Sequence, residues 1–306
     1  MGIDIHALQL LKHNQKNKGN LGKTITLGRL SVLLGPKLAK KWAGTDQGAW
    51  CEDLLMKHFG ATEVDSIDNS DYEGAKIVFD YNQPVPKELH QQYDTVIDFG
   101  CSEHIFNVAQ VFKNTADMCK IGGRILHILP ADNFCGHGFY QFTPEFFFSI
   151  YSEENGYGET EIFLSDLYNY KEWYKASKPK SGERINIKTR NETYIIVVAE
   201  KISGVVLKAQ QSDYQHVWNK SQSTQAKPHK PGRLMALQEF FQFSPSAVKI
   251  IVAVNNLLAT NGSKKLCSNR HLSKHKLDEI EIQFLHPMIT VSSPLMGVMQ
   301  FIKSAK

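Results

Sequence analysis

The first two thirds of the chain alternate between short apolar runs and longer amphipathic segments. Apolar or β-branched runs, which predict strands, occupy residues 23–28, 63–68, 76–80, 93–99, 123–130, 160–166 and 192–202. Residues 45–60, 103–123 and 143–155 lie between them and show the apolar spacing of helices. This alternation is typical of a mostly parallel sheet with helices on both faces. We predict a Rossmann-like α/β fold with a seven-stranded sheet, in which the last two strands can pair antiparallel at one edge.

The composition changes near Val205. Residues 1–205 carry 22 Lys and Arg against 26 Asp and Glu, whereas residues 206–306 carry 13 against 5. We therefore predict an α/β domain over 1–205, a polar linker over 206–233 and a basic, mainly helical extension over 234–306. Within that extension, RLMALQEFFQF and SPSAVKIIVAVNNLLAT read as two helices, and the residues that follow them, NGSKKLCSNRHLSKHK, read as a basic loop.

Several classes of protein are disfavoured by the sequence. No stretch approaches the roughly 18 consecutive apolar residues of a membrane span, and the N-terminus lacks the apolar core of a secretory signal. The five cysteines are scattered without a C-x-x-C pair, which indicates a reducing compartment and a cytoplasmic location.

The basic region lacks the interleaved aromatic residues of a single-strand binder, which argues against nucleic acid as a partner. The apolar segment 289–306 ends in lysines and is compatible with peripheral contact with a membrane, although packing against its own domain is the commoner outcome.

Polar residues gather where predicted strands end. The segment DTVIDFGCSEHIFN, residues 94–107, passes from a buried strand to Asp98, Gly100, Glu103 and His104. In open α/β sheets, ligands bind outside the carboxyl ends of the strands. This segment is therefore expected to border a binding site.

The order and spacing of these motifs over residues 21–202 resemble those of the class I S-adenosylmethionine-dependent methyltransferases. The resemblance rests on VIDFGCSEHIF after the fourth strand, KIGGRILHILP around the fifth and FTPEFF at the next helix start. It implies S-adenosylmethionine as cofactor, lying across the carboxyl ends of the first strands. The chain departs from the family after strand 1, where LGRLSVLLG (27–35) replaces G-x-G-x-G.

The resemblance assigns cofactor contacts to residues at the ends of the first three strands. Gly28 would supply the turn after strand 1, and Arg29 would either pair with the cofactor carboxylate or form a structural salt bridge. Asp68 would accept bonds from the ribose hydroxyls, with Asp65 as the competing choice, and Asp80 would lie near adenine. The alternative for these aspartates is that they cap the turns that follow.

The resemblance also assigns roles after strand 4. Asp98 and Gly100 would lie beside the methionine part of the cofactor, and Glu103 and His104 would begin the following helix near it. A carboxylate in a first helical turn also suits the positive helix N-terminus. We therefore interpret this cluster as half helix cap and half pocket wall.

The loop ADNFCGHGFYQF (131–142) is the predicted place for chemistry on the acceptor. His137 and Tyr140 are the candidate catalytic residues, because an alcohol or phenol acceptor benefits from a base with a pKa near neutrality. The alternative is a loop histidine bonded to backbone carbonyls. No metal site is predicted, since His271 and His275 are flanked by lysines and have no acidic partner.

The sequence thus predicts a methyltransferase that uses S-adenosylmethionine to methylate oxygen or nitrogen of a small molecule or sugar. The alternative is a non-catalytic, methyltransferase-like binding or scaffold protein that has lost the cofactor turn. A nicotinamide-dependent enzyme is a weaker third choice, because G-x-G-x-x-G is also missing. The segment LGRLSVLLG discriminates between the first two, according to whether Arg29 or Leu30 fills the cleft facing Asp68.

Overall fold

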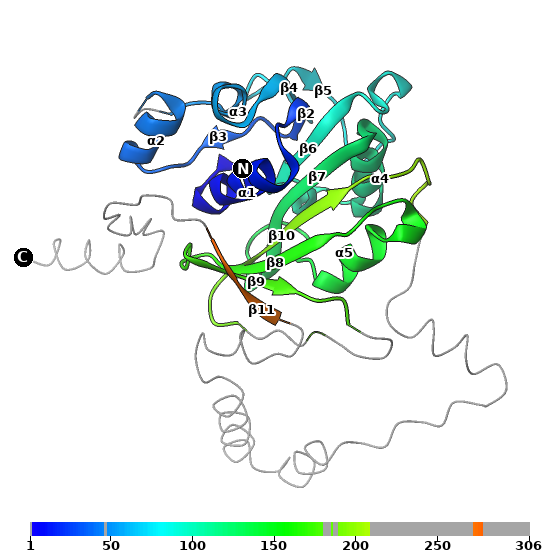
Figure 1. Cartoon of the computed structure of the whole chain (residues 1–306). Helices are drawn as coiled ribbons and strands as arrows, with labels where there is room; N and C mark the ends of the chain where they lie inside the picture. Colours follow the sequence, from blue (N-terminus) through cyan, green and yellow to red (C-terminus); the bar gives the residue numbers. More distant parts are fainter. Residues whose placement is uncertain (1, 46–47, 180–184, 186–188, 209–271, 278–306) are drawn as a thin grey trace, which may run out of the picture.

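The computed structural model describes residues 2–45, 48–179, 185, 189–208 and 272–277 (Figure 1). The two helices predicted at the start of the C-terminal extension lie outside these residues. The elements are β1 (Gly2–Ile3), α1 (Ile5–Lys18), β2 (Gly22–Leu27), β3 (Ser31–Val32), α2 (Pro36–Ala43), α3 (Cys51–Phe59), β4 (Ala61–Asp68), β5 (Ile77–Val78), η1 (Lys87–Leu89), β6 (Tyr93–Phe99), η2 (Ser102–His104), α4 (Val108–Met118), β7 (Cys119–Asp132), α5 (Pro144–Ile150), η3 (Glu153–Asn155), β8 (Glu161–Asp166), β9 (Glu172–Ala176), β10 (Thr193–Glu200) and β11 (Leu272–Lys276). Among them, no helix is both long and apolar enough to cross a membrane.

The described strands form a nine-stranded sheet in the order β11-β9-β8-β10-β7-β6-β2-β4-β5, beside a small pair of β1 and β3. The strands from β5 to β7 run parallel, whereas β10 is antiparallel to both β7 and β8. The predicted α/β class is confirmed. The sheet has nine strands where seven were predicted, and β10 lies inside the sheet because β8 and β9 continue beyond it.

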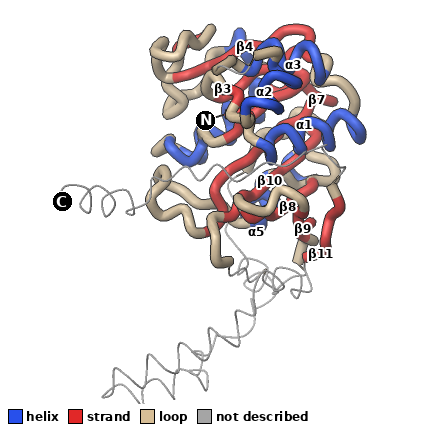
Figure 2. The backbone as a smooth tube through the Cα atoms, turned by 90° about the vertical axis from the view of Figure 1, so that its left-hand side faces the viewer, coloured by secondary structure: helices blue, strands red, loops and turns tan. Residues whose placement is uncertain are grey.

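Helices cover both faces of the sheet. On one face α1, α2 and α3 pack against side chains such as Ile97 and Leu126, and on the other α4 and α5 pack against neighbours such as Val96 and Ile125 (Figures 1 and 2). Successive residues of a strand point to opposite faces, so each central strand contributes side chains to the apolar core on either face of the sheet. Strands buried on both faces carry continuous apolar runs, and these runs allowed the strands to be predicted from the sequence.

The helix predicted over 103–123 is shorter in the structure. It is divided into η2 and α4, and Asn107 caps α4 by accepting a bond from the Gln110 amide at 3.4 Å. Residues 119–123 belong to β7, where the Gly122 amide donates to the Lys201 carbonyl at 2.7 Å. In residues 119–123, strand pairing with the segment around Lys201 therefore prevails over the helical spacing of the apolar residues. The helix predicted over 45–60 is also shorter and begins at Cys51.

Part of the basic C-terminal region belongs to the sheet. Leu272–Lys276 was predicted as a loop but forms β11, antiparallel to β9, with Leu272 opposite Ala176 and His275 opposite Trp173. Figure 1 shows this strand at the lower edge of the sheet. The chain beyond Val205 thus returns to the α/β domain at this point.

An ion pair joins α1 to the outer strands. The Glu161 carboxylate lies 3.0 Å from His13 Nε2 and 3.1 Å from Lys175 Nζ. The hydrogen bond from His13, followed by the nearby charges, lowers the pKa of Glu161 from 4.5 to about 2. A carboxylate with a depressed pKa stabilises the fold above its ordinary pKa, and this contribution is lost as the pH falls toward the folded-state value.

We expect Glu161→Gln to reduce the free energy of unfolding by about 2 kcal/mol at pH 6 and by much less at pH 3, where wild type has lost most of the same contribution. Urea denaturation at the two pH values measures both differences. Glu159→Gln is the matched control, because Glu159 faces the same Lys175 at 3.7 Å but is 85% exposed. Equal losses for Glu161→Gln at both pH values would contradict the assignment.

Candidate functional site

The strand order reverses between β2 and β6. From β2 the chain builds outward through β4 and β5, and then crosses to the other side to add β6 and β7. Ligands of open α/β sheets bind in the crevice outside the carboxyl ends of the strands at this switch point. Beside it, a cavity of about 220 Å³ is lined by Gly2, Asp4, Ala7, Leu33, Phe99, Gly100, Glu103, His104, Ile128, His137 and Tyr194.

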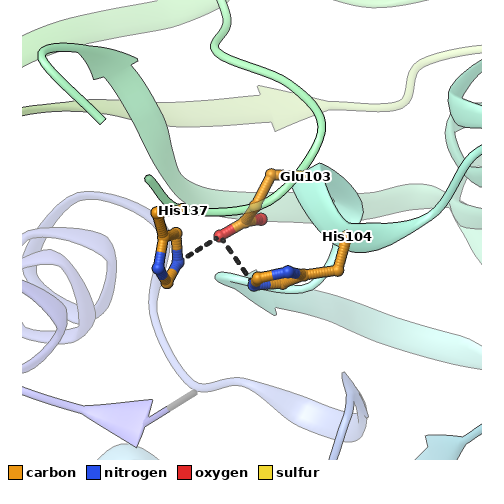
Figure 3. Close-up of side chains that lie close together, drawn as sticks. All are labelled: Glu103, His104 and His137. Atoms are coloured by element: carbon orange, nitrogen blue, oxygen red, sulfur yellow. Dashed lines mark ion pairs between the residues drawn. The ribbon is translucent and has the colours of Figure 1, made fainter. Parts of the chain in front are cut away.

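Three side chains meet at one wall of this cavity (Figure 3). Glu103 Oε1 lies 3.4 Å from His137 Nε2 and 3.8 Å from His104 Nε2, so both imidazoles face the same carboxyl oxygen. The two rings lie edge to face, with centroids 4.8 Å apart. The structure therefore brings the predicted base, His137, together with two residues assigned from another motif.

Backbone contacts hold this cluster in place. The Glu103 carbonyl accepts the Phe139 amide at 2.7 Å and the Tyr140 amide at 3.3 Å, which docks the loop carrying His137 on the turn after β6. Gly138 permits this approach because its φ is +72°, and a Cβ there would lie 2.8 Å from the Glu103 carbonyl oxygen. A side chain at position 138 would separate the two segments.

The Glu103 carboxyl is buried, with only 1% of the side chain exposed. Burial, followed by the charge of Asp98, raises its pKa to about 8. The pKa of His104 is lowered by burial and then by His137. At pH 7 Glu103 is therefore mainly protonated, and among the described residues its Oε2 has no hydrogen-bond partner.

Asp98 is fully buried on the α4 side of the sheet. Its carboxylate accepts the amides of Cys101 at 3.1 Å and Ser102 at 3.3 Å, and it lies 2.9 Å from His127 Nδ1. His127 Nε2 in turn lies 2.6 Å from the Tyr151 hydroxyl. Asp98 thus acts on the site by fixing the turn that carries Glu103. Sequence reasoning missed His127, and a histidine within the apolar run 123–130 was the available signal.

The residues predicted to hold a cofactor occupy the ends of β2, β4 and β5. Gly28 has a φ of +74° where β2 ends, and Asp68 is partly exposed where β4 ends. Asp68 accepts a bond from the Asn69 amide at 2.6 Å through Oδ1, and its Oδ2 has no hydrogen bond within the described residues. Asp80 is exposed and caps its own turn through Asn82. Asp65 is buried and bound by the Tyr93 hydroxyl at 2.8 Å.

The side chain of Arg29 is held by contacts with neighbouring residues of the fold. Its Nε lies 2.7 Å from Glu52 Oε1, its Nη1 donates to the Glu73 carbonyl at 3.1 Å, and its guanidinium stacks on Trp50. Leu30 is fully buried in the core beneath α3. Of the two roles open to Arg29, this geometry is that of the structural salt bridge.

Gly100 and Tyr140 both lie next to the turn that carries Glu103. Gly100 has a φ of +90°, which lets the chain turn immediately after β6. Gly100 also lines the cavity. The Tyr140 hydroxyl donates to the Phe106 carbonyl at 2.6 Å, so it is already paired. Gly2, Asp4 and Tyr194 complete the cavity wall from segments to which the sequence had given no role.

No protein-family model and no curated protein sequence matches this chain. Among solved structures, TehB from Haemophilus influenzae is similar with 14% identity, over 62% of this chain and 61% of that one, with a TM-score of 0.37. An S-adenosylmethionine-dependent methyltransferase from Thermotoga maritima shows 12% identity over 64% and 92% (TM-score 0.35), and YcgJ from Bacillus subtilis 11% over 64% and 99% (TM-score 0.36). Such identities and TM-scores are too low to transfer an activity.

Proposed function

We propose that this chain is a methyltransferase that uses S-adenosylmethionine to methylate an oxygen or nitrogen atom of a small molecule or sugar. The observation that supports this most is the switch point between β2 and β6, where Gly28, Asp68 and Gly100 surround the carboxyl ends of the central strands. Such a crevice is the general place for ligands in open α/β sheets. The identity of the cofactor follows from the motif resemblance described above.

Asp68 fits the ribose of a nucleoside cofactor. Its Oδ2 has no hydrogen bond within the described residues, and a carboxylate can accept bonds from two neighbouring hydroxyls. The Tyr81 hydroxyl is buried and unpaired within the same described part, and its pKa is raised by burial and then by the charges of Cys101, Asp98 and Asp68. Gly28 and Gly100 both have a positive φ, +74° and +90°, which glycine adopts without strain. When bound, S-adenosylmethionine supplies an electrophilic methyl group.

The cavity beside the switch point is the proposed place for the acceptor. It is walled by the apolar side chains of Phe99, Leu33 and Ile128 and by the polar cluster at Glu103. In methyl transfer the protein mainly has to align the reacting atoms, because proximity supplies much of the rate. The half-exposed His137 faces this cavity, which suits it to accept the proton of an alcohol or amine acceptor.

One observation favours the second candidate, a binding protein without cofactor. The Arg29 side chain bridges Glu52 and the Glu73 carbonyl, and so occupies the space between the segments that follow β2 and β4. Those are the segments that a nucleoside cofactor would contact. A direct binding measurement separates the two candidates.

We expect S-adenosylhomocysteine to bind the full chain at micromolar concentration in isothermal titration calorimetry. Asp68→Ala should weaken binding at least tenfold, about 1.4 kcal/mol, because the ribose hydroxyls lose their acceptor. Asp71→Ala is the matched control, since Asp71 is exposed in the loop after β4 and its side chain has no hydrogen bond within the described residues. Absence of heat at millimolar ligand would favour the binding protein.

A further inference from the structure

The Glu103 cluster has the composition of a metal site. It offers one carboxylate oxygen and two imidazole nitrogens, all within 4.8 Å of one another. Two histidines and one glutamate form a common ligand set for catalytic zinc, which keeps a further position open for water or substrate. The set also matches the facial triad that binds ferrous iron.

The distances are close to those that a bound ion requires. Two ligands of a tetrahedral zinc ion, with bonds of about 2.0–2.2 Å, lie about 3.3–3.5 Å apart. Glu103 Oε1 and His137 Nε2 are already 3.4 Å apart, and His104 Nε2 lies 3.8 Å from the same oxygen. The ligand atoms of all three residues lie within 4.8 Å of one another, and both imidazoles are about half exposed, which leaves their rings room to rotate toward a common ion.

A second observation points to a missing ligand. Glu103 is 1% exposed and lines the cavity, and its Oε2 lacks a hydrogen-bond partner among the described residues. A buried carboxyl oxygen without a hydrogen-bond partner is costly, because it has lost its hydration and nothing replaces it. Pairing with the two histidines alone accounts for Oε1 and leaves Oε2 unexplained.

We propose that Glu103, His104 and His137 form a binding site for a divalent transition metal, with zinc as the first candidate and an open coordination position facing the cavity. The loop docked through the Glu103 carbonyl and the tight contact at Gly138 hold the ligands together before the metal binds. Such preorganisation favours a specific site. The open position would take an oxygen or nitrogen atom of a small ligand in the cavity.

The described residues that line the cavity include acidic side chains and no basic ones apart from histidine. Asp4 lines it and no lysine or arginine does, within the part of the chain that the structure describes. The other described histidine pocket, at His13 and His275, is lined by Lys12 and Lys16, which repel a cation. The metal site is therefore assigned to Glu103 and its neighbours.

Metal binding does not depend on the proposed methyl transfer and is tested without cofactor. Metal-free full chain is titrated with zinc chloride by calorimetry, and cobalt chloride is used in parallel for its visible absorption. Wild type should bind one zinc ion that is lost, or weakened at least tenfold, in His104→Ala, His137→Ala and Glu103→Gln. The two histidine changes are at half-exposed side chains, and the glutamine keeps the volume of Glu103, so all three should fold as judged by circular dichroism.

His90→Ala is the matched control. His90 precedes β6 at the end opposite Glu103, and its ring contacts only the Val85 carbonyl among the contacts described. The control should bind zinc and cobalt as wild type does. Failure of wild type to bind zinc at 1 mM, or binding that His104→Ala and His137→Ala leave unchanged, would overturn the proposal. A zinc-bound His137 cannot accept a proton, so a loaded site would also remove the base role suggested for it.

Discussion

Replacing Asp98 by alanine is expected to lower the free energy of unfolding by about 3–5 kcal/mol. The carboxylate is fully buried and bonds to two amides, the Ser102 hydroxyl and His127. Its removal leaves these groups buried without their partner, and each lost partner carries a desolvation cost. Because a typical domain is stable by only about 5–15 kcal/mol, a single change of this size is a large fraction of the total.

Urea denaturation followed by circular dichroism at 222 nm measures this effect. Asp94→Ala, on the same strand, is the matched control. Asp94 pairs with Lys120 at 2.7 Å and accepts the Lys23 amide at 2.8 Å, but its side chain is 41% exposed, so the expected loss is about 1 kcal/mol. Asp98→Asn keeps the size of the side chain and should fall between the two. An Asp98→Ala variant as stable as Asp94→Ala would show that the buried network does not hold the turn after β6.

The central strands could be predicted from the sequence because burial on both faces leaves continuous apolar runs. The run 93–99 became β6 with the predicted ends. Strand β9, with the sequence EWYKA, carries no continuous apolar run. It lies near the edge of the sheet, where β11 is its outer neighbour and α1 packs against it. Helix α1 was not predicted because His6, Gln9 and Asn14 are buried in it, which obscures the helical spacing of apolar residues.

Individual residues of the candidate site could be singled out from the sequence, but their meeting in one cluster could not. Glu103 and His104 were assigned to a cofactor wall and His137 to acceptor chemistry, because they belong to different motifs. Their meeting depends on the docking of residues 138–140 on the Glu103 carbonyl, and no local pattern encodes this contact. The engagement of Arg29 by Glu52 is likewise a tertiary contact that the turn sequence does not reveal.

Replacing Trp173 by alanine is expected to cost a similar 3–5 kcal/mol, for a different reason. The indole is fully buried on β9 and packs against Phe163 with ring centroids 5.5 Å apart. Its Nε1 donates to His6 Nδ1 of α1 at 3.3 Å. Alanine leaves a cavity between α1 and the outer strands that these elements cannot fill, since both are fixed by their own pairings.

The same change should loosen β11, because His275 lies opposite Trp173 and stacks near its ring at 6.4 Å. We expect faster amide hydrogen exchange in residues 272–276 than in wild type, together with the lower denaturation midpoint. Trp173→Phe, which restores most of the volume, should recover much of both. Tyr168→Ala is the control, since Tyr168 is 66% exposed in the turn between β8 and β9. Unchanged exchange in 272–276 in a destabilised Trp173→Ala would mean that the C-terminal strand is held by backbone pairing alone, and not by the aromatic core beneath α1.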